Sequence, residues 1–117
     1  LKTDEDVAAV AAYVASLPDL KPAPVLEGGD PARGAPIYAT CAGCHGPDGR
    51  GNQAVSAPGL RYTSDWYQLT QLKNYKQGIR GSNPKDVEGA AMRGMSMLLA
   101  DEQMMKDVIA YVLSLPE

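Results

Sequence analysis

The sequence predicts an all-α fold in which short helices are joined by long loops. Apolar residues recur at three-to-four spacing in several segments, as they do along one face of a helix. No segment of useful length alternates between apolar and polar residues as a strand does. The 117 residues include 12 glycines and 9 prolines, which keep the helices short and favour irregular connections. This length is that of one small domain.

The first two helices are expected near the N-terminus. Within residues 1–18, Thr3 and Asp6 form a capping-box pattern ahead of a run rich in alanine and valine. A second helix is expected over residues 30–40, with Pro31 in its first turn, where a missing N–H costs no hydrogen bond. This second helix leads directly into the only two cysteines of the chain.

Two further helices are expected in the middle of the chain. One follows Ser64 or Asp65, either of which is a suitable N-cap residue. Its apolar face and its end are marked by Leu69, Leu72, Tyr75 and Gly78. The next helix is expected to begin at Asn83, as N-cap, with Pro84 at its first position.

The last helix is expected from an N-cap at Asp101 through Leu115. Val108, Val112 and Leu115 lie at i, i+4 and i+7, which predicts a buried stripe. Pro116 then ends the helix.

The charge and hydropathy of the chain exclude two classes of partner. The formal net charge is −3, and nucleic-acid binding requires a clustered basic surface, so nucleic acid is not an expected partner. No run of 18 apolar residues exists, so no membrane-spanning segment is expected. The chain does not begin with Met, so the lack of a signal peptide says nothing about export.

The chemistry-bearing motif is Cys41-Ala-Gly-Cys44-His45, which contains the only histidine. A structural zinc site would need a fourth ligand, and no second Cys/His cluster exists. A thioredoxin-like redox pair would need flanking strands, and a disulfide across so short a loop is strained. Covalent attachment of haem is favoured. Two thiols on one helical turn reach the two vinyl groups of a porphyrin, and His45 supplies an axial nitrogen.

The two ends of the chain resemble each other. Residues 1–18 align without a gap with the last helix at an offset of 98 positions, pairing Tyr13 with Tyr111, and both segments contain Tyr-Val-x-Ser-Leu-Pro. An internal repeat is therefore expected, limited to the closing helix. We expect residues 1–18 to be the closing helix of a preceding domain, residues 19–29 to be a linker, and residues 30–117 to be a complete domain.

Three motifs together resemble the class I cytochromes c, in particular the second half of bacterial two-domain cytochromes c. They are "GDPARGAPIYATCAGCHGPDGRGN", "APGL…DWYQLTQLKNYKQGIRG" and "MRGMSMLLADEQMMKDVIAYVLSLP". The resemblance implies a small all-α class I fold around one covalent haem c, attached through Cys41 and Cys44 and ligated by His45. It further implies that the Pro58 carbonyl orients His45. The implied haem-lining residues are Leu60, Trp66, Tyr67, Leu72 and Tyr75.

The resemblance also assigns the methionines of a stretch expected to be a loop. The family ligand lies nine residues before the aspartate of the last helix, which gives Met92 as the sixth iron ligand. Met95 is then expected to pack on the haem edge, and Met97 to be filler or surface. A thioether ligand opposite histidine raises the reduction potential of haem iron.

The expected function is one-electron transfer by a carrier that is not itself an enzyme. An alternative is a domain or subunit of a larger respiratory oxidase or dehydrogenase complex. A third hypothesis is a five-coordinate haem that binds gas or peroxide. Redox proteins are the expected partners, in the periplasm or at the outer face of the cytoplasmic membrane. Arg80, Lys85 and Arg93 are expected to assist docking, contact a propionate or form solvated surface.

Overall fold

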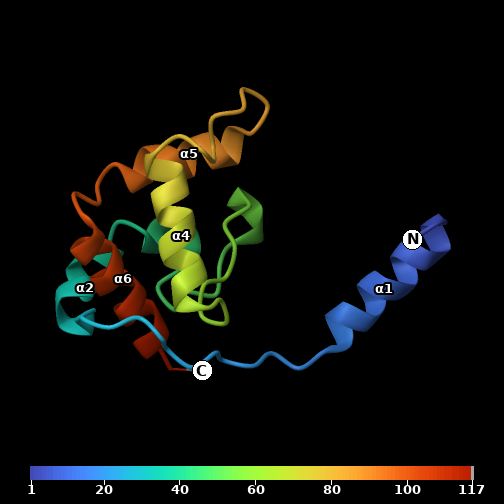
Figure 1. Ribbon diagram of the computed structural model, residues 1–117, viewed down its shortest axis with the longest axis horizontal. Coiled ribbons are helices and arrows are strands. Elements are labelled where there is room, and N and C mark those ends of the chain that lie inside the picture. The colour runs from blue at the N-terminus through green and yellow to red at the C-terminus, as the bar shows by residue number, and fades with distance from the viewer. Residues whose placement is uncertain (117) are drawn as a thin grey trace.

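The computed structural model describes residues 1–116, and these residues form an all-α fold (Figure 1). The predicted fold class is confirmed. The only β-type pairing within residues 1–116 is an isolated bridge between Asn52 and Ala57. The helical elements are α1 (Asp4–Ser16), α2 (Pro31–Tyr38), α3 (Ala42–His45), the 3₁₀ helix η1 (Gln53–Val55), α4 (Asp65–Lys76), α5 (Val87–Ser96) and α6 (Glu102–Ser114).

Helix α1 stands apart from the rest of the molecule, at the end of an extended segment (Figure 1). None of its residues is buried. At its N-terminus, Thr3 Oγ1 accepts a hydrogen bond from the Asp6 N–H at 3.1 Å, as the capping-box pattern predicts. The Asp6 carboxylate accepts from the Lys2 N–H at 3.2 Å.

The longest helices have 13 residues each. A bilayer span needs about 20 apolar residues. No helix within residues 1–116 meets that requirement.

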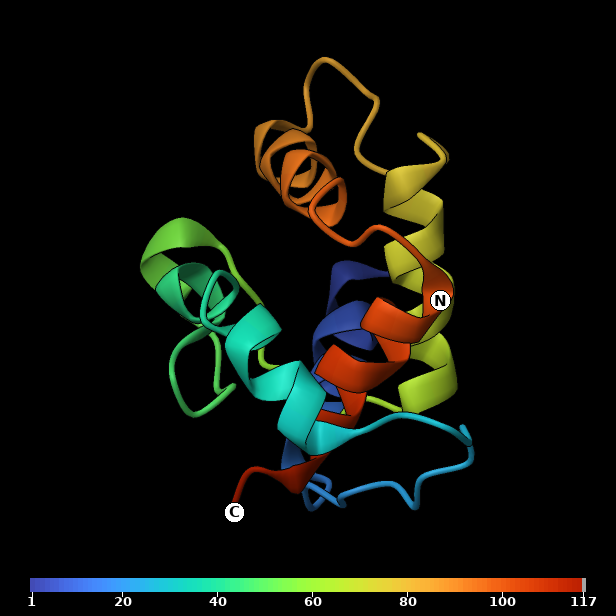
Figure 2. The same cartoon turned by 90° about the vertical axis from the view of Figure 1, so that its left-hand side faces the viewer.

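The core lies where α2 crosses α6, with α4 packed beside them (Figure 2). Gly34 is buried at the crossing, and a Cβ atom placed there would lie 2.5 Å from the Asp107 carbonyl carbon. The rings of Tyr38 and Tyr111 meet at a centroid distance of 5.4 Å. Val108 and Val112 are buried, as predicted, while Leu115 is only half-buried. The buried apolar cluster consists of Tyr38, Leu69, Leu99, Met105, Val108, Ile109 and Val112.

Asp107 is a buried carboxylate at this crossing, which the sequence did not reveal. Arg33 Nε donates to one of its oxygens at 2.9 Å, and the Asp30 N–H donates to the other at 2.9 Å. Gln103 Nε2 donates to that second oxygen at 2.9 Å. The hydrogen bond from Arg33 is the main reason that the pKa of Asp107 falls to about 2. The carboxylate therefore ties the start of α2 to α6.

Asp107→Asn is expected to lower the free energy of unfolding by roughly 2 kcal/mol, the scale of a charged hydrogen bond. Because the folded-state pKa lies below the ordinary value, the contribution is complete above about pH 4 and is lost as the pH falls through about 2. Urea unfolding at several pH values measures it. The wild-type minus variant difference should shrink below pH 4, while Asp19→Asn, at an exposed position, should show no such change.

Residues 21–29 form a strap that lies across the domain, although residues 19–29 were predicted to be a linker. Lys21 Nζ donates to the Leu115 carbonyl at 2.9 Å. The N–H groups of Val25 and Leu26 both donate to Asp65 Oδ2, at 2.9 and 2.8 Å. Leu26 also packs against the core cluster. The strap is therefore part of the folded domain, because a buried carboxylate on α4 satisfies its backbone.

Helix α5 differs from the sequence prediction. It begins at Val87 with Asp86 as N-cap, whose Oδ1 accepts from the Gly89 N–H at 2.9 Å. The prediction of Asn83 as N-cap and Pro84 as first residue was wrong. Asn83 instead caps a separate turn, in which its Oδ1 accepts from the Lys85 N–H at 2.9 Å.

The stretch of methionines was also predicted incorrectly as a loop. Met92 and Met95 lie within α5, and Met97 is its C-cap residue. The helical prediction for α4 is confirmed, with Ser64 at the N-cap position, although its side chain makes no capping hydrogen bond. Asp101 caps α6 as expected, accepting from the Met104 N–H at 2.9 Å.

Candidate functional site

The cysteines lie on α3, a single helical turn that follows α2 almost at once. The Cys41 N–H donates to the Tyr38 carbonyl at 2.8 Å, so the end of α2 fixes the start of α3. Cys41 is the N-cap residue and is half-buried, whereas Cys44 is exposed. Both are free thiols, and burial raises the pKa of Cys41. The thiols are therefore presented on one turn without a disulfide.

His45 is buried at the end of α3, and its ring is held by one hydrogen bond. Its Nδ1 lies 2.8 Å from the carbonyl oxygen of Pro58. A carbonyl can only accept, so Nδ1 carries the proton and Nε2 is left with its lone pair. This is the arrangement of a metal-ligating histidine whose second nitrogen is oriented by an acceptor. It is also the contact that the family resemblance implies.

The loop that carries Pro58 is held back against α3. The Gly51 N–H donates to the His45 carbonyl at 2.7 Å, and the Leu60 N–H donates to the Gly49 carbonyl at 2.9 Å. Gly51 has φ +87°, and a Cβ there would meet the backbone of Pro58 at 2.7 Å. Only glycine at this position therefore lets the two segments of the loop, around Gly51 and around Pro58, approach so closely.

Two residues that sequence reasoning missed hold the same loop. The Tyr38 hydroxyl, buried in the core, donates to the Gly46 carbonyl at 2.7 Å, and burial raises its pKa to about 12. Gln68 Nε2 donates to the carbonyls of Leu60 and Thr63, both at 2.9 Å. Gln68 lies four residues before Leu72 and seven before Tyr75, on the apolar stripe of α4 itself, so a polar residue at a stripe position was the signal that could have revealed its role.

The residues expected to line a haem fall into two groups. Leu60 and Leu72 are half-buried and pack against the core cluster, and Tyr75 is buried. Trp66 and Tyr67 are 55% and 42% exposed, with their rings edge to face at 6.1 Å. Large exposed aromatic side chains at the start of α4 form a surface that a flat apolar cofactor would cover.

The side chains of Met92, Met95 and Met97 differ in their exposure to solvent. Met92 is half-buried, whereas Met95 and Met97 are 37% and 49% exposed. Met92 and Met95 are three residues apart on α5 and so share a side of that helix. Helix α5 packs against α4, the helix that carries the exposed aromatic pair.

These residues fit a covalently bound haem of the c type. Two free thiols on one turn supply the attachment points, and a buried histidine keeps Nε2 for the iron. A structural zinc site needs four protein ligands, one more than Cys41, Cys44 and His45 provide. Within residues 1–116, no three His, Cys, Asp or Glu side chains converge on a point that could hold a metal ion. The fold and site thus define a small helical c-type haem protein.

Comparison with known proteins identifies the family. Residues 31–116 match the family model described as "Cytochrome c", and the chain belongs to the cytochrome c family. It is 39% identical over 90 residues to the Cbb3-type cytochrome c oxidase subunit FixP of Bradyrhizobium diazoefficiens, covering 72% of this chain and 29% of that protein. It is 31% identical over 118 residues to cytochrome c4 of Azotobacter vinelandii, covering 92% of this chain and 51% of that protein.

A solved structure shows the same fold. The thiosulfate dehydrogenase TsdBA from Marichromatium purpuratum matches with a TM-score of 0.72 and 30% identity, over 97% of this chain and 25% of that one. The chain spans at most about half the length of these relatives (29%, 51% and 25%). Family membership confirms an electron-transfer domain with one covalent haem c. Electron carriers of this family are in general not enzymes, although some relatives are parts of oxidase or dehydrogenase complexes.

Proposed function

We propose that this domain transfers single electrons through a haem c attached to Cys41 and Cys44, with His45 and Met92 as axial ligands. The observation that carries the proposal is the 2.8 Å contact between His45 Nδ1 and the Pro58 carbonyl. That contact fixes the tautomer and the ring orientation that coordination through Nε2 requires. When bound, the haem supplies an iron that gains and loses one electron. The chain's own residues hold it and set its potential.

The choice of Met92 rests on two independent arguments. In the resemblance, the ligand stands nine residues before the N-cap of the last helix, and Asp101 occupies that N-cap. In the structure, Met92 is half-buried, whereas Met95 is more exposed and so better placed to pack on a cofactor edge. Trp66 and Tyr67 are proposed to line the haem and Met95 to pack on its edge, while Leu60, Leu72 and Tyr75 connect that surface to the core.

A haem iron that keeps two strong axial ligands when it is reduced has no open coordination position for a small ligand. The ferric holoprotein is therefore expected to show the red-region sulfur-to-iron charge-transfer band, and the ferrous form is expected not to bind CO readily. Absorption spectra of both forms test this. A ferric protein without the band whose ferrous form takes up CO at once would instead be a five-coordinate haem for gas or peroxide.

We further propose that α1 is the closing helix of a preceding domain of the same kind, so that this domain works within a larger protein. At the offset of 98 positions, Val10 and Val14 of α1 correspond to Val108 and Val112 of α6. The α6 residues are buried, whereas Val10 and Val14 are 46% and 58% exposed. A helix of 13 residues is only marginally stable in water unless it packs against another element. Val10 and Val14 therefore need a partner helix to cover them, as α2 packs on α6.

Removal of residues 1–18 from the holoprotein is expected to leave its thermal midpoint within about 1 °C, because nothing on α1 is buried. Removal of residues 1–29 should lower the midpoint by several degrees, since the Asp65 carboxylate would lose its two strap donors. Thermal denaturation of both truncations measures the difference. A large fall in the thermal midpoint when only residues 1–18 are removed would contradict the proposal for α1.

The proposed setting is the periplasm or the outer face of the cytoplasmic membrane, with redox proteins as partners. Relatives described as subunits of a cbb3-type oxidase, and as a thiosulfate dehydrogenase electron acceptor, support this setting. Here the domain would pass electrons within a respiratory complex or between soluble carriers. Neither role requires catalytic residues in this chain.

A further inference from the structure

Gln68 is a buried amide at a position where the pattern of α4 predicts an apolar side chain. Only 8% of its surface is exposed, and it lies on the same side of the helix as Leu72 and Tyr75. Burying an amide costs free energy unless it is hydrogen-bonded, so leucine would serve better than glutamine if packing were the only requirement. The presence of glutamine therefore points to a task that its hydrogen bonds perform.

The amide of Gln68 uses both of its donor hydrogens on one turn of the neighbouring loop. Nε2 donates to the carbonyl oxygens of Leu60 and Thr63, each at 2.9 Å. The Thr63 N–H donates to the same Leu60 carbonyl at 3.3 Å, which closes the turn. The backbone of Gln68 is fixed as well, because its N–H donates to the Ser64 carbonyl at 3.0 Å. The amide therefore fastens this turn to the first half of α4.

The other polar side chains of α4 do not hold this loop. Within residues 1–116, Gln68 is the only α4 residue whose side chain forms a hydrogen bond with residues 58–63. Asp65, at the start of the same helix, binds the backbone of the strap instead. The polar attachment of the loop to α4 thus depends on one amide.

The turn that Gln68 holds lies next to the carbonyl that orients the histidine. One residue, Gly59, separates Leu60 from Pro58, so a shift of the Leu60 carbonyl moves the Pro58 carbonyl with it. The Pro58 carbonyl oxygen lies 2.8 Å from His45 Nδ1. Hydrogen bonds weaken steeply as their distance and angle depart from the preferred values. A small movement of the turn is therefore enough to weaken the hydrogen bond of His45.

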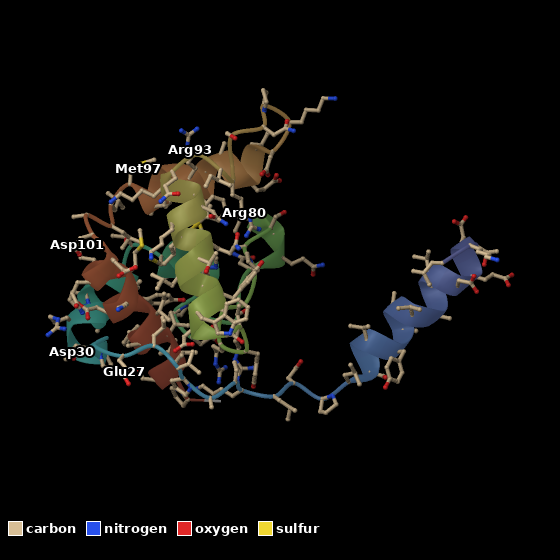
Figure 3. The ribbon with its side chains drawn as sticks, viewed as in Figure 1. Glu27, Asp30, Arg80, Arg93, Met97 and Asp101 are labelled. Carbon is tan, nitrogen blue, oxygen red and sulfur yellow. The ribbon has the colours of Figure 1, made fainter. Side chains whose placement is uncertain are left out.

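Helix α4 connects the two sides of the site. Gln68 lies in its first half, whereas α5, which carries Met92, packs near its C-terminal end. Just beyond that end, a Cβ atom on Gly78 would be 3.0 Å from Nη2 of Arg93. Figure 3 shows Arg93 and Met97, both at the end of α5, near this end of α4. A change at Gln68 is therefore expected to act on the histidine side and to leave the methionine side in place.

We propose that Gln68 is a positioning residue that sets the strength of the hydrogen bond from His45 to the Pro58 carbonyl and, through it, the reduction potential of the haem iron. The proposal rests on the proposed function, in which His45 Nε2 binds the iron. A strong hydrogen bond from Nδ1 makes Nε2 a better electron donor, and a better donor favours ferric iron. Gln68 thus keeps the potential below the value that a loosely held loop would give.

Two substitutions of Gln68 and one matched control test this role in the holoprotein. Gln68→Leu removes both donors and suits the apolar stripe of α4, so the fold is retained. Gln68→Asn keeps a polar amide but is one methylene too short to reach both carbonyls. Gln103→Leu is the control, because Gln103 Nε2 also bridges two acceptors, the Gly28 carbonyl at 2.7 Å and Asp107 Oδ1 at 2.9 Å, outside the loop.

Two measurements report on the histidine and on the iron. Exchange of the His45 Nδ1–H with D₂O is followed by proton NMR of the ferrous protein, and the potential is measured by spectroelectrochemistry. Both Gln68 variants are expected to exchange this proton about tenfold faster than the wild type and to have a higher potential. Gln103→Leu should retain both wild-type values. The ferric charge-transfer band should be present in all four proteins.

A merely structural role for Gln68 would give a different result. If both Gln68 variants unfold at lower urea concentration but keep the exchange rate and the potential, Gln68 only stabilises the fold and the proposal is wrong. If Gln68→Leu alone raises the potential, the polarity of the position is responsible, which also overturns the proposal. A wild-type protein without the charge-transfer band would refute ligation by Met92, whereas the exchange rate of the His45 proton would still decide the role of Gln68.

Discussion

Met92→Ala is expected to convert the holoprotein from a carrier into a haem with an open coordination site. The ferric charge-transfer band should disappear, and the ferrous form should bind CO readily, because no second histidine exists to replace the sulfur. The reduction potential should fall substantially, since axial ligands set haem potentials over a range of roughly 0.8 V. Absorption spectra, CO titration and spectroelectrochemistry measure the three effects.

The neighbouring methionines provide matched controls. Met97→Ala should retain the band and the potential, because Met97 is exposed at the C-cap of α5. Met95→Ala should retain the band and shift the potential only slightly, through loss of packing at the cofactor edge. If instead Met95→Ala abolishes the band and Met92→Ala retains it, the two roles are exchanged.

Gly34→Ala is expected to destabilise the fold by about 3 kcal/mol or more, one of the largest losses from any single methyl group in this chain. The added Cβ would collide with the carbonyl group of Asp107 and lie 2.9 Å from the Tyr111 Cβ. The obstructing carbonyl belongs to the backbone of α6, so α2 and α6 would have to move apart. Because α2 leads into α3, that movement would also displace Cys41 from the position its core contacts give it.

Gly94→Ala is the control for this change. Gly94 lies within α5, and a Cβ there would meet nothing within 4 Å. Alanine should therefore stabilise the protein by about 0.5–1 kcal/mol through helix propensity. Chemical denaturation of the Gly34→Ala and Gly94→Ala holoproteins gives their free energies of unfolding. A mild effect of Gly34→Ala would mean that the helices separate easily and that close approach does not define this crossing.

Local signals in the sequence predicted most of the helices. Asp101 was expected as the N-cap of an apolar-periodic segment and is found there, and the helix expected over residues 30–40 is found over Pro31–Tyr38. Helix α5 was misplaced because Asn83 and Asp86 are both good caps three residues apart. Only the tertiary contacts choose between them, since Gly81 must approach the backbone of Gly89.

The haem-attachment motif could be predicted from its spacing, but the groups that support it could not. Pro58 entered through the family resemblance, since nothing local indicates which carbonyl will face His45. Asp107 resembles an ordinary surface residue of an amphipathic helix, and its burial follows from the position of Arg33, 74 residues away. The strap was predicted as a linker because its proline and glycine content is typical of one. Its two hydrogen bonds to Asp65 span about 40 residues of sequence.

The strap also fixes where the polypeptide leaves the domain. Lys21 is anchored to the Leu115 carbonyl, so the chain toward α1 departs from the C-terminal end of α6. Figure 1 shows that this exit and α5 lie at opposite ends of the helical body. A module joined through residues 1–20 would therefore attach at the end of the helical body opposite α5 and would leave α5 uncovered.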